Sequence, residues 1–485
     1  MTELRELRGR SAAGGAGGAV PADRDRWADA LRVGSLLVVV AGHWLVVVLT
    51  SGLHISNALS IVPSLQPLTW ILQVMPLFFL VGGVANSFLL DSSARRGGTD
   101  RGRYAGFVRV RAVRLLRPTL VFLGVWVAFG VVAHLTGLTS DARGEWGRLV
   151  RDALVAVPQL LWFIGMYLGV CAFAPLMLRA HRRWGARVFA ALALAAAAID
   201  AIRFSAGSGL VGNLNFAFVW LALHQLGFAW HDGRLGRRVG WSLFVGGYAV
   251  MLACVVLGPY PTSMVGLPGE AVSNMAPPTF ALLAQGVGIS GLAAVLRPWM
   301  SVVLARRRPF VGVVVAGRFT MTVFLWHLTA LMVVLLGLRA VGIVQPSVAS
   351  LAWWLTRPLL FAVLVAVSAV FVVAFARFDH FDRGVPGARA VPAESRRWVD
   401  PAAAIAAFVI FFGILMVSIV GVDVLGNRPV FFILGDVTPA VGFAVLGAGL
   451  ALLALARPRT TATPHPSKGQ VRPPLTRRKA KSGHP

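Results

Sequence analysis

The first apolar segment of the chain carries an arginine and a histidine whose spacing favours a shared task. Arg32 and His43 are eleven residues apart, so in an α-helix they lie on one face with roughly 16 Å of rise between them. Asp29 lies near the same face. A fixed cation at one end and a titratable base farther in suit an anionic reagent that reacts deep in the protein, because histidine can take a proton from a hydroxyl near neutral pH. The alternative is structural: His43 bonds to a neighbouring helix and Arg32 anchors the membrane interface.

A second candidate group is a run of arginines between the second and third apolar segments. Arg111, Arg114 and Arg117 follow one another at intervals of three, and residues three apart share a helix face. Such a ladder can hold a pyrophosphate or a 3′-phosphate through charge-assisted hydrogen bonds. Anchoring of the membrane topology explains the same arginines equally well.

A third group lies in the stretch Phe319-Thr-Met-Thr-Val-Phe-Leu-Trp-His327. It places hydroxyls, an indole and an imidazole within three helical turns, which makes Thr322, Trp326 and His327 candidates for an acceptor site; helix packing is the alternative. The cysteines Cys171 and Cys254 stand in no ligand spacing, so we expect neither a disulfide nor a zinc site. We expect no metal and no tightly bound cofactor.

The elements that must position these residues are helices in a lipid bilayer. The 485 residues are 57% hydrophobic and 13% charged, which is too few charges to cover a soluble surface of this size. Apolar runs of the roughly 20 residues that one span needs recur along the chain, without the alternation of a β-barrel. The sequence therefore predicts an all-α polytopic bundle of about 12 transmembrane helices, with spans near residues 30–51, 68–90, 118–136, 155–178, 185–202, 214–231, 238–258, 277–296, 310–337, 351–376, 402–422 and 430–456.

The net charge of +27 is explained by its placement. The basic residues cluster in alternate connections between the apolar runs, which is the positive-inside pattern of a cell-membrane protein with both termini in the cytoplasm. The chain is thus expected to contact membrane lipid and not nucleic acid. Its basic ends, residues 1–26 and 457–485, are predicted to be disordered.

Five motifs occur together in the chain: Asp29-Ala-Leu-Arg32 followed after ten residues by His43, Met75-Pro-Leu-Phe-Phe79 with Gly82-Gly83, Arg111-Ala-Val-Arg114, Leu161-Trp-Phe163 and Phe324-Leu-Trp-His327. In combination they resemble the membrane-bound acyltransferase family 3, over about residues 25–383. The stretch from Trp220 to Gly227 also resembles the actinobacterial branch. Gly82 and Gly83 depart from the serine and glycine of many members, and two further spans follow residue 400.

This resemblance implies a ten-helix acyltransferase core at residues 27–390, with two additional helices at 401–456. It implies transfer of an acyl group, commonly acetyl, from a cytoplasmic acyl-CoA co-substrate to a hydroxyl of a carbohydrate, glycolipid or secreted metabolite. His43 becomes the essential histidine, as general base or as covalent acyl carrier, with Arg32 and Asp29 beside it. The resemblance also assigns Arg111 and Arg114 to acyl-CoA binding and His327 to the acceptor or substrate cavity. We add Arg117 to the donor side from its spacing, and Trp326, Thr322, Trp162 and His224 to the cavity.

A transporter or flippase of a glycan precursor or small metabolite is the alternative from another functional class. Many-span proteins with histidine and arginine at membrane depth often move substrates. The sequence contains no evident internal repeat of the transporter kind.

Overall fold

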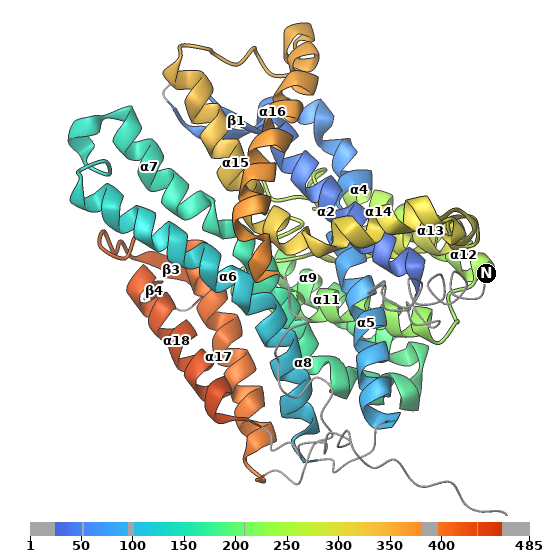
Figure 1. The fold of residues 1–485 in the computed structure, drawn as a ribbon. Coiled ribbons are helices and arrows are strands. Elements are labelled where there is room, and N and C mark those ends of the chain that lie inside the picture. Colours follow the sequence, from blue (N-terminus) through green and yellow to red (C-terminus); the bar gives the residue numbers. More distant parts are fainter. Residues whose placement is uncertain are drawn as a thin grey trace, which may run out of the picture.

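The computed structural model describes residues 25–50, 53–95, 101–207, 209–379, 396–433 and 435–457. In this part of the chain, ten helices or continuous helical stretches are long and apolar enough to cross a membrane. The predicted sixth and twelfth spans are each occupied by a helix of 17 residues, α11 (Asn215–His231) and α18 (Pro439–Leu455). Figure 1 shows the helices packed into a bundle, and the prediction of an all-α polytopic membrane protein is confirmed. Residues 1–24 and 458–485, which include nearly all of the two ends predicted to be disordered, lie outside the described residues.

The first membrane helix, α2 (Arg26–Val46), begins at a well-defined cap. The Asp25 side chain accepts hydrogen bonds from backbone N–H groups of its first turn, and also from Trp230 Nε1 at 2.8 Å and Arg297 Nη2 at 2.9 Å. One carboxylate thus satisfies a helix N-terminus and ties α2 to two later helices. After α2 come the elements β1 (Val47–Leu49), β2 (Ile55–Asn57), α3 (Ala58–Ile61), η1 (Pro63–Leu68) and α4 (Thr69–Leu72).

The arginine ladder lies inside one continuous helix. The third span was predicted at 118–136, but α6 (Arg103–Leu135) begins well before it, so all three ladder arginines belong to the same helix. The elements around it are α5 (Met75–Arg95), η2 (Asp141–Arg143), α7 (Glu145–Ala156), η3 (Pro158–Leu160), α8 (Leu161–Trp184), α9 (Ala186–Ala206), α10 (Gly209–Gly212), α12 (Arg237–Leu257) and α13 (Phe280–Ala305).

The predicted ninth span, 310–337, is broken into two helices. The short helix α14 (Arg307–Arg318) ends one residue before α15 (Thr320–Ala340), and Phe319 between them has φ −108° and ψ 4°, outside the helical range. Figure 1 shows α14 lying at a steep angle to α15. Apolar residues continue through the break, so hydropathy alone does not mark it. The next elements are α16 (Leu351–Phe375) and η4 (Ala376–Phe378).

Two helix pairs pack backbone against backbone through glycines. A Cβ atom on Gly83 of α5 would collide with the carbonyl oxygen of His224 in α11, and one on Gly227 would collide with the carbonyl oxygen of Leu80. On α12, a Cβ on Gly247 would likewise meet the backbone of α13. Small residues permit this close approach, which is a usual means of helix association in membranes.

The C-terminal helical hairpin packs against α6, the helix that carries the arginine ladder. It consists of α17 (Val399–Val420), β3 (Val430–Phe432), β4 (Gly435–Val437) and α18. The Asp400 carboxylate accepts hydrogen bonds from the N–H groups of Gly102 at 2.8 Å and Ala105 at 2.9 Å, at the start of α6. Arg109 of α6 donates to the carbonyl oxygen of Leu453 in α18 at 3.3 Å. Figure 1 shows this hairpin alongside α6 and α8.

Candidate functional site

Two of the predicted site residues meet between α2 and α15. His43 Nδ1 lies 3.2 Å from His327 Nε2, and the ring centroids are 5.0 Å apart. His327 is fully buried, whereas His43 is half-buried. Trp44 holds the two helices together at this level, because its Nε1–H donates to the carbonyl oxygen of His327 at 3.1 Å. We refer to His43 and His327 as the histidine pair.

Backbone carbonyl groups decide which ring nitrogens of the histidine pair carry protons, because a carbonyl oxygen only accepts hydrogen bonds. The His327 Nδ1–H donates to the carbonyl oxygen of Phe324 at 2.6 Å, which leaves Nε2 of neutral His327 as an acceptor. The His43 Nδ1–H donates to the carbonyl oxygen of Val39 at 2.8 Å and is shared with His327 Nε2. Neutral His43 therefore keeps its lone pair on Nε2, and a proton taken up there produces an imidazolium whose Nδ1–H already has two acceptors.

Arg32 lies at the other end of the same stripe on α2. Its Nη2 is 3.7 Å from Asp29 Oδ1, and a Cβ atom on Gly317 of α14 would lie 3.6 Å from Nη2. The stripe thus faces the α14–α15 segment at both ends. The Nε atom of Arg32 is buried and has no hydrogen-bond partner among the described residues, so this N–H group is available to a ligand.

The positive charges of Arg32, Arg111 and Arg114 lie near enough to influence the hydroxyl of Tyr167 in α8. Tyr167 was not among the site residues predicted from the sequence. Its ring requires glycine at position 82 of α5, because a Cβ atom there would lie 2.8 Å from Tyr167 Cε2 and 3.1 Å from the hydroxyl oxygen. We call Arg32, Arg111, Arg114 and Tyr167 the arginine cluster.

The three arginines of the predicted ladder have different surroundings. Arg111 is 9% exposed. Its Nη2 donates to the carbonyl oxygen of Ala85 in α5 at 2.8 Å, and its buried Nε has no hydrogen-bond partner in the described part of the chain. Arg114 and Arg117 are exposed, since each step of three residues rotates the side chain by about 60° around the helix. Arg111 and Arg114 belong to the arginine cluster, whereas the exposed Arg117 does not.

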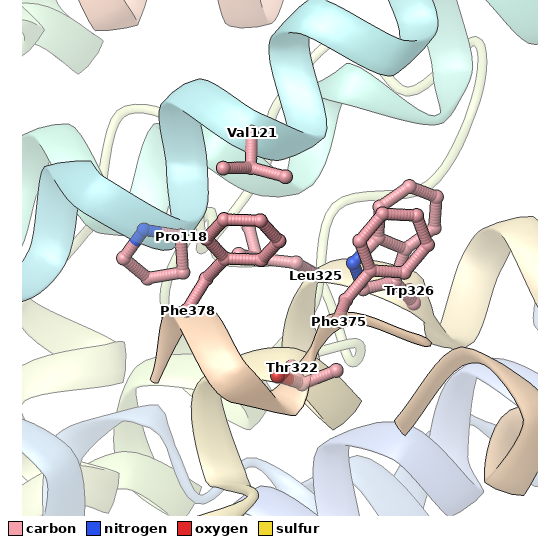
Figure 2. Close-up of a pocket in the computed structure, with 7 residues that line it drawn as sticks. All are labelled: Pro118, Val121, Thr322, Leu325, Trp326, Phe375 and Phe378. Atoms are coloured by element: carbon pink, nitrogen blue, oxygen red, sulfur yellow. The ribbon is translucent and has the colours of Figure 1, made fainter. Parts of the chain in front are cut away.

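Trp326 and Thr322 face away from the histidine pair, toward α6 and α16. Trp326 stacks on Phe375 with ring centroids 4.1 Å apart and on Phe371 at 5.1 Å. A shallow recess without room for a water molecule is lined by Pro118, Val121, Thr322, Leu325, Trp326, Phe375 and Phe378. Figure 2 shows the indole of Trp326 against the ring of Phe375, and Thr322 at the margin of the recess. The lining is almost entirely apolar, which suits packing or an apolar ligand better than a sugar.

The other two residues predicted for the acceptor cavity, Trp162 and His224, lie apart from the histidine pair. Trp162 contacts the rings of Phe163 and Trp220, with centroids 6.2 and 6.3 Å away. His224 is fully buried in α11, where its Nε2 accepts a hydrogen bond from Asn86 Nδ2 at 2.9 Å. Their part in acceptor binding stays a prediction.

Asp379 is a further residue at the site that the sequence analysis missed. Its Oδ2 accepts a hydrogen bond from the N–H of Thr322 at 2.9 Å, in the first turn of α15, where an anion is favoured by the helix dipole. An acidic residue directly after a predicted span was the available signal. The described residues contain no group of three or more His, Cys, Asp or Glu side chains placed to hold a metal ion.

Comparison with known protein families shows where the chain belongs. The family model described as an acyltransferase domain matches residues 25–376, which include α2, the arginine cluster and the histidine pair. Curated proteins and solved structures provide no match to the chain. Because the matched segment covers most of the chain and holds every site residue predicted from the sequence, the protein belongs to the membrane-bound acyltransferase family 3.

Proposed function

We propose that the protein transfers an acyl group, acetyl in the first instance, from cytoplasmic acyl-CoA to a hydroxyl of a carbohydrate, glycolipid or secreted metabolite. The observation that carries this proposal is the histidine pair, which lies three helical turns from Arg32 on the same face of α2. In an acyltransferase, such a histidine is suited to remove the proton of the attacking hydroxyl.

The proposed step uses the lone pair on His43 Nε2. The acceptor hydroxyl gives its proton to this atom while its oxygen attacks the thioester carbonyl carbon. The C–O bond forms, the C–S bond breaks, and the CoA thiolate takes the proton from Nε2. The Val39 carbonyl oxygen and His327 Nε2 both accept from the Nδ1–H of His43, so they stabilise the imidazolium that exists between the two proton transfers.

The arginine cluster is the proposed binding site of the donor. Buried N–H groups without partners among the described residues, the Nε atoms of Arg32 and Arg111, suit the phosphate groups of CoA. The charge distribution between the spans supports a cytoplasmic location for this end of α2 and for both termini, in the cell membrane. Acyl-CoA would then reach the site from the cytoplasm as a co-substrate, and we propose no tightly bound cofactor.

The test is release of CoA from acetyl-CoA by the purified full chain in detergent, with and without acceptor. His43→Ala should lower the rate about 10²- to 10⁴-fold, the usual contribution of a general base. His134→Ala is the matched control, because His134 is exposed in the last turn of α6 and belongs to neither the histidine pair nor the arginine cluster. This variant should keep the wild-type rate. An unchanged rate in His43→Ala, at equal yield and equal thermal unfolding temperature, would contradict the mechanism.

A further inference from the structure

The arginine cluster and the histidine pair are separated along α2. Eleven residues between Arg32 and His43 correspond to roughly 16 Å of helix. If the cluster holds the phosphates of CoA, the pantetheine arm has to cover this distance before its acyl group reaches His43. The side chains between the arginine cluster and the histidine pair would therefore determine which acyl groups can reach His43.

A continuous series of rings connects the two ends. Starting from Tyr167 in the arginine cluster, the ring of Phe163 is 5.8 Å away between centroids. Phe324 of α15 follows at 5.5 Å, with the two rings edge to face. From Phe324 to His327 the distance is 6.0 Å. The order along this series is therefore Tyr167, Phe163, Phe324, His327 and then His43.

Phe163 and Phe324 are tightly surrounded. They are 8% and 4% exposed, and Phe163 also contacts the rings of Phe78 at 5.2 Å and Phe79 at 5.9 Å. The backbone carbonyl of Phe324 also accepts the hydrogen bond from His327 Nδ1. We call these two residues the aromatic collar.

We propose that the aromatic collar sets the acyl chain length and restricts the donor to acyl groups of two or three carbons. This inference rests on the proposed function. Side chains packed at interior density accept extra methylene groups poorly, and one methylene in a tight apolar site changes kcat/KM by roughly 10- to 200-fold. Shortening either ring opens the space that a longer chain needs.

The experiment measures kcat/KM of the full chain for acetyl-, propionyl-, butyryl- and hexanoyl-CoA. Wild type should prefer acetyl- over butyryl-CoA. Phe324→Ala and Phe163→Ala should raise the ratio of butyryl to acetyl turnover at least tenfold, and Phe324→Leu and Phe163→Leu, which disturb the packing less, should raise it in the same direction. Phe173→Ala is the matched control on α8, since Phe173 faces Phe408 of α17 at 5.5 Å and lies outside the ring series; its ratio should stay within twofold of wild type.

Two results would overturn the collar without touching the proposed function. One is wild type that uses hexanoyl-CoA as well as acetyl-CoA. The other is an unchanged ratio of butyryl to acetyl turnover in leucine variants that still release CoA from acetyl-CoA at a measurable rate. Failure of the proposed function has a different signature, because wild type would then release CoA from none of the four thioesters.

Discussion

The two ends of the candidate site are held in different ways. At the histidine pair, both rings are fixed by backbone carbonyl groups, with hydrogen bonds of 2.6 and 2.8 Å, and by each other. At the arginine cluster, Arg111 donates to the Ala85 carbonyl oxygen of α5, and the Arg114 side chain is exposed. The comparison suggests that the chemical end is pre-organised, whereas the donor end adapts to its ligand.

The largest effect is expected when His43 loses the hydrogen bond that it shares with His327. His327→Ala should lower kcat about 10- to 100-fold, because a hydrogen bond to a charged group contributes about 1.5–3 kcal/mol and 1.36 kcal/mol is a factor of ten. KM for acyl-CoA should change less than twofold. Steady-state kinetics on the purified variant measure both values.

A double variant shows whether His327 acts through His43. In a protein that already carries His43→Ala, His327→Ala should cost no further activity, since residues that act as a unit are not additive. As a single substitution in a protein that keeps His43, His327→Gln should have a higher kcat than His327→Ala, because the glutamine side-chain oxygen can accept from the Nδ1–H of His43. A full multiplicative loss in the double variant would contradict the pre-organised pair.

The donor end is tested by comparing two arginines of one helix. Arg111→Ala should raise KM for acyl-CoA about tenfold through loss of a charge-assisted contact, with little change in kcat. Arg117→Ala, outside the cluster, should change KM less than twofold. The KM of an acyl-pantetheine substrate, which lacks the nucleotide phosphates, should be the same in both variants and in wild type. Equal effects of the two substitutions on acyl-CoA would show that the ladder only anchors topology.

The smallest expected effect concerns the contact between Asp400 of the C-terminal hairpin and the start of α6. Asp400→Ala removes the acceptor of two N–H groups at the start of α6 and should lower the free energy of unfolding by about 1 kcal/mol, the usual value of a helix cap. Thermal unfolding in detergent measures it. Asp436→Ala, an exposed acid of β4, is the control and should have no effect. If both variants unfold like wild type, the hairpin does not brace α6 through Asp400.

The spans and the stripe on α2 were predictable because they depend on local periodicity. Hydropathy located the helices, and the eleven-residue spacing placed Arg32 and His43 on one face of a helix, toward α14 and α15. The contact between His43 and His327 was not predictable, since it joins residues 284 positions apart and nothing local to either one specifies the partner.

Other features depend on contacts between helices and leave little local signal. Tyr167 lies in an ordinary apolar run, and only the glycine at position 82 on another helix makes room for it. The ladder interval of three suggested a common face for Arg111 and Arg117, yet the rotation accumulates to about 120° over two steps, and burial by neighbouring helices then separates them. The break at Phe319 lies within an apolar stretch, where tertiary packing overrides hydropathy.

The glycine contacts between helices have a mechanical consequence. Helices α5 and α11, and likewise α12 and α13, approach so closely at Gly83, Gly227 and Gly247 that neither member of a pair can slide without a backbone collision. These pairs form a rigid frame. The seam between α2 and α15 is bridged by side chains instead, through the histidine pair and Trp44, and rotamers adjust far more easily than backbones. Any opening that admits an acceptor to His43 is therefore expected to occur at this seam, with His43 on its edge.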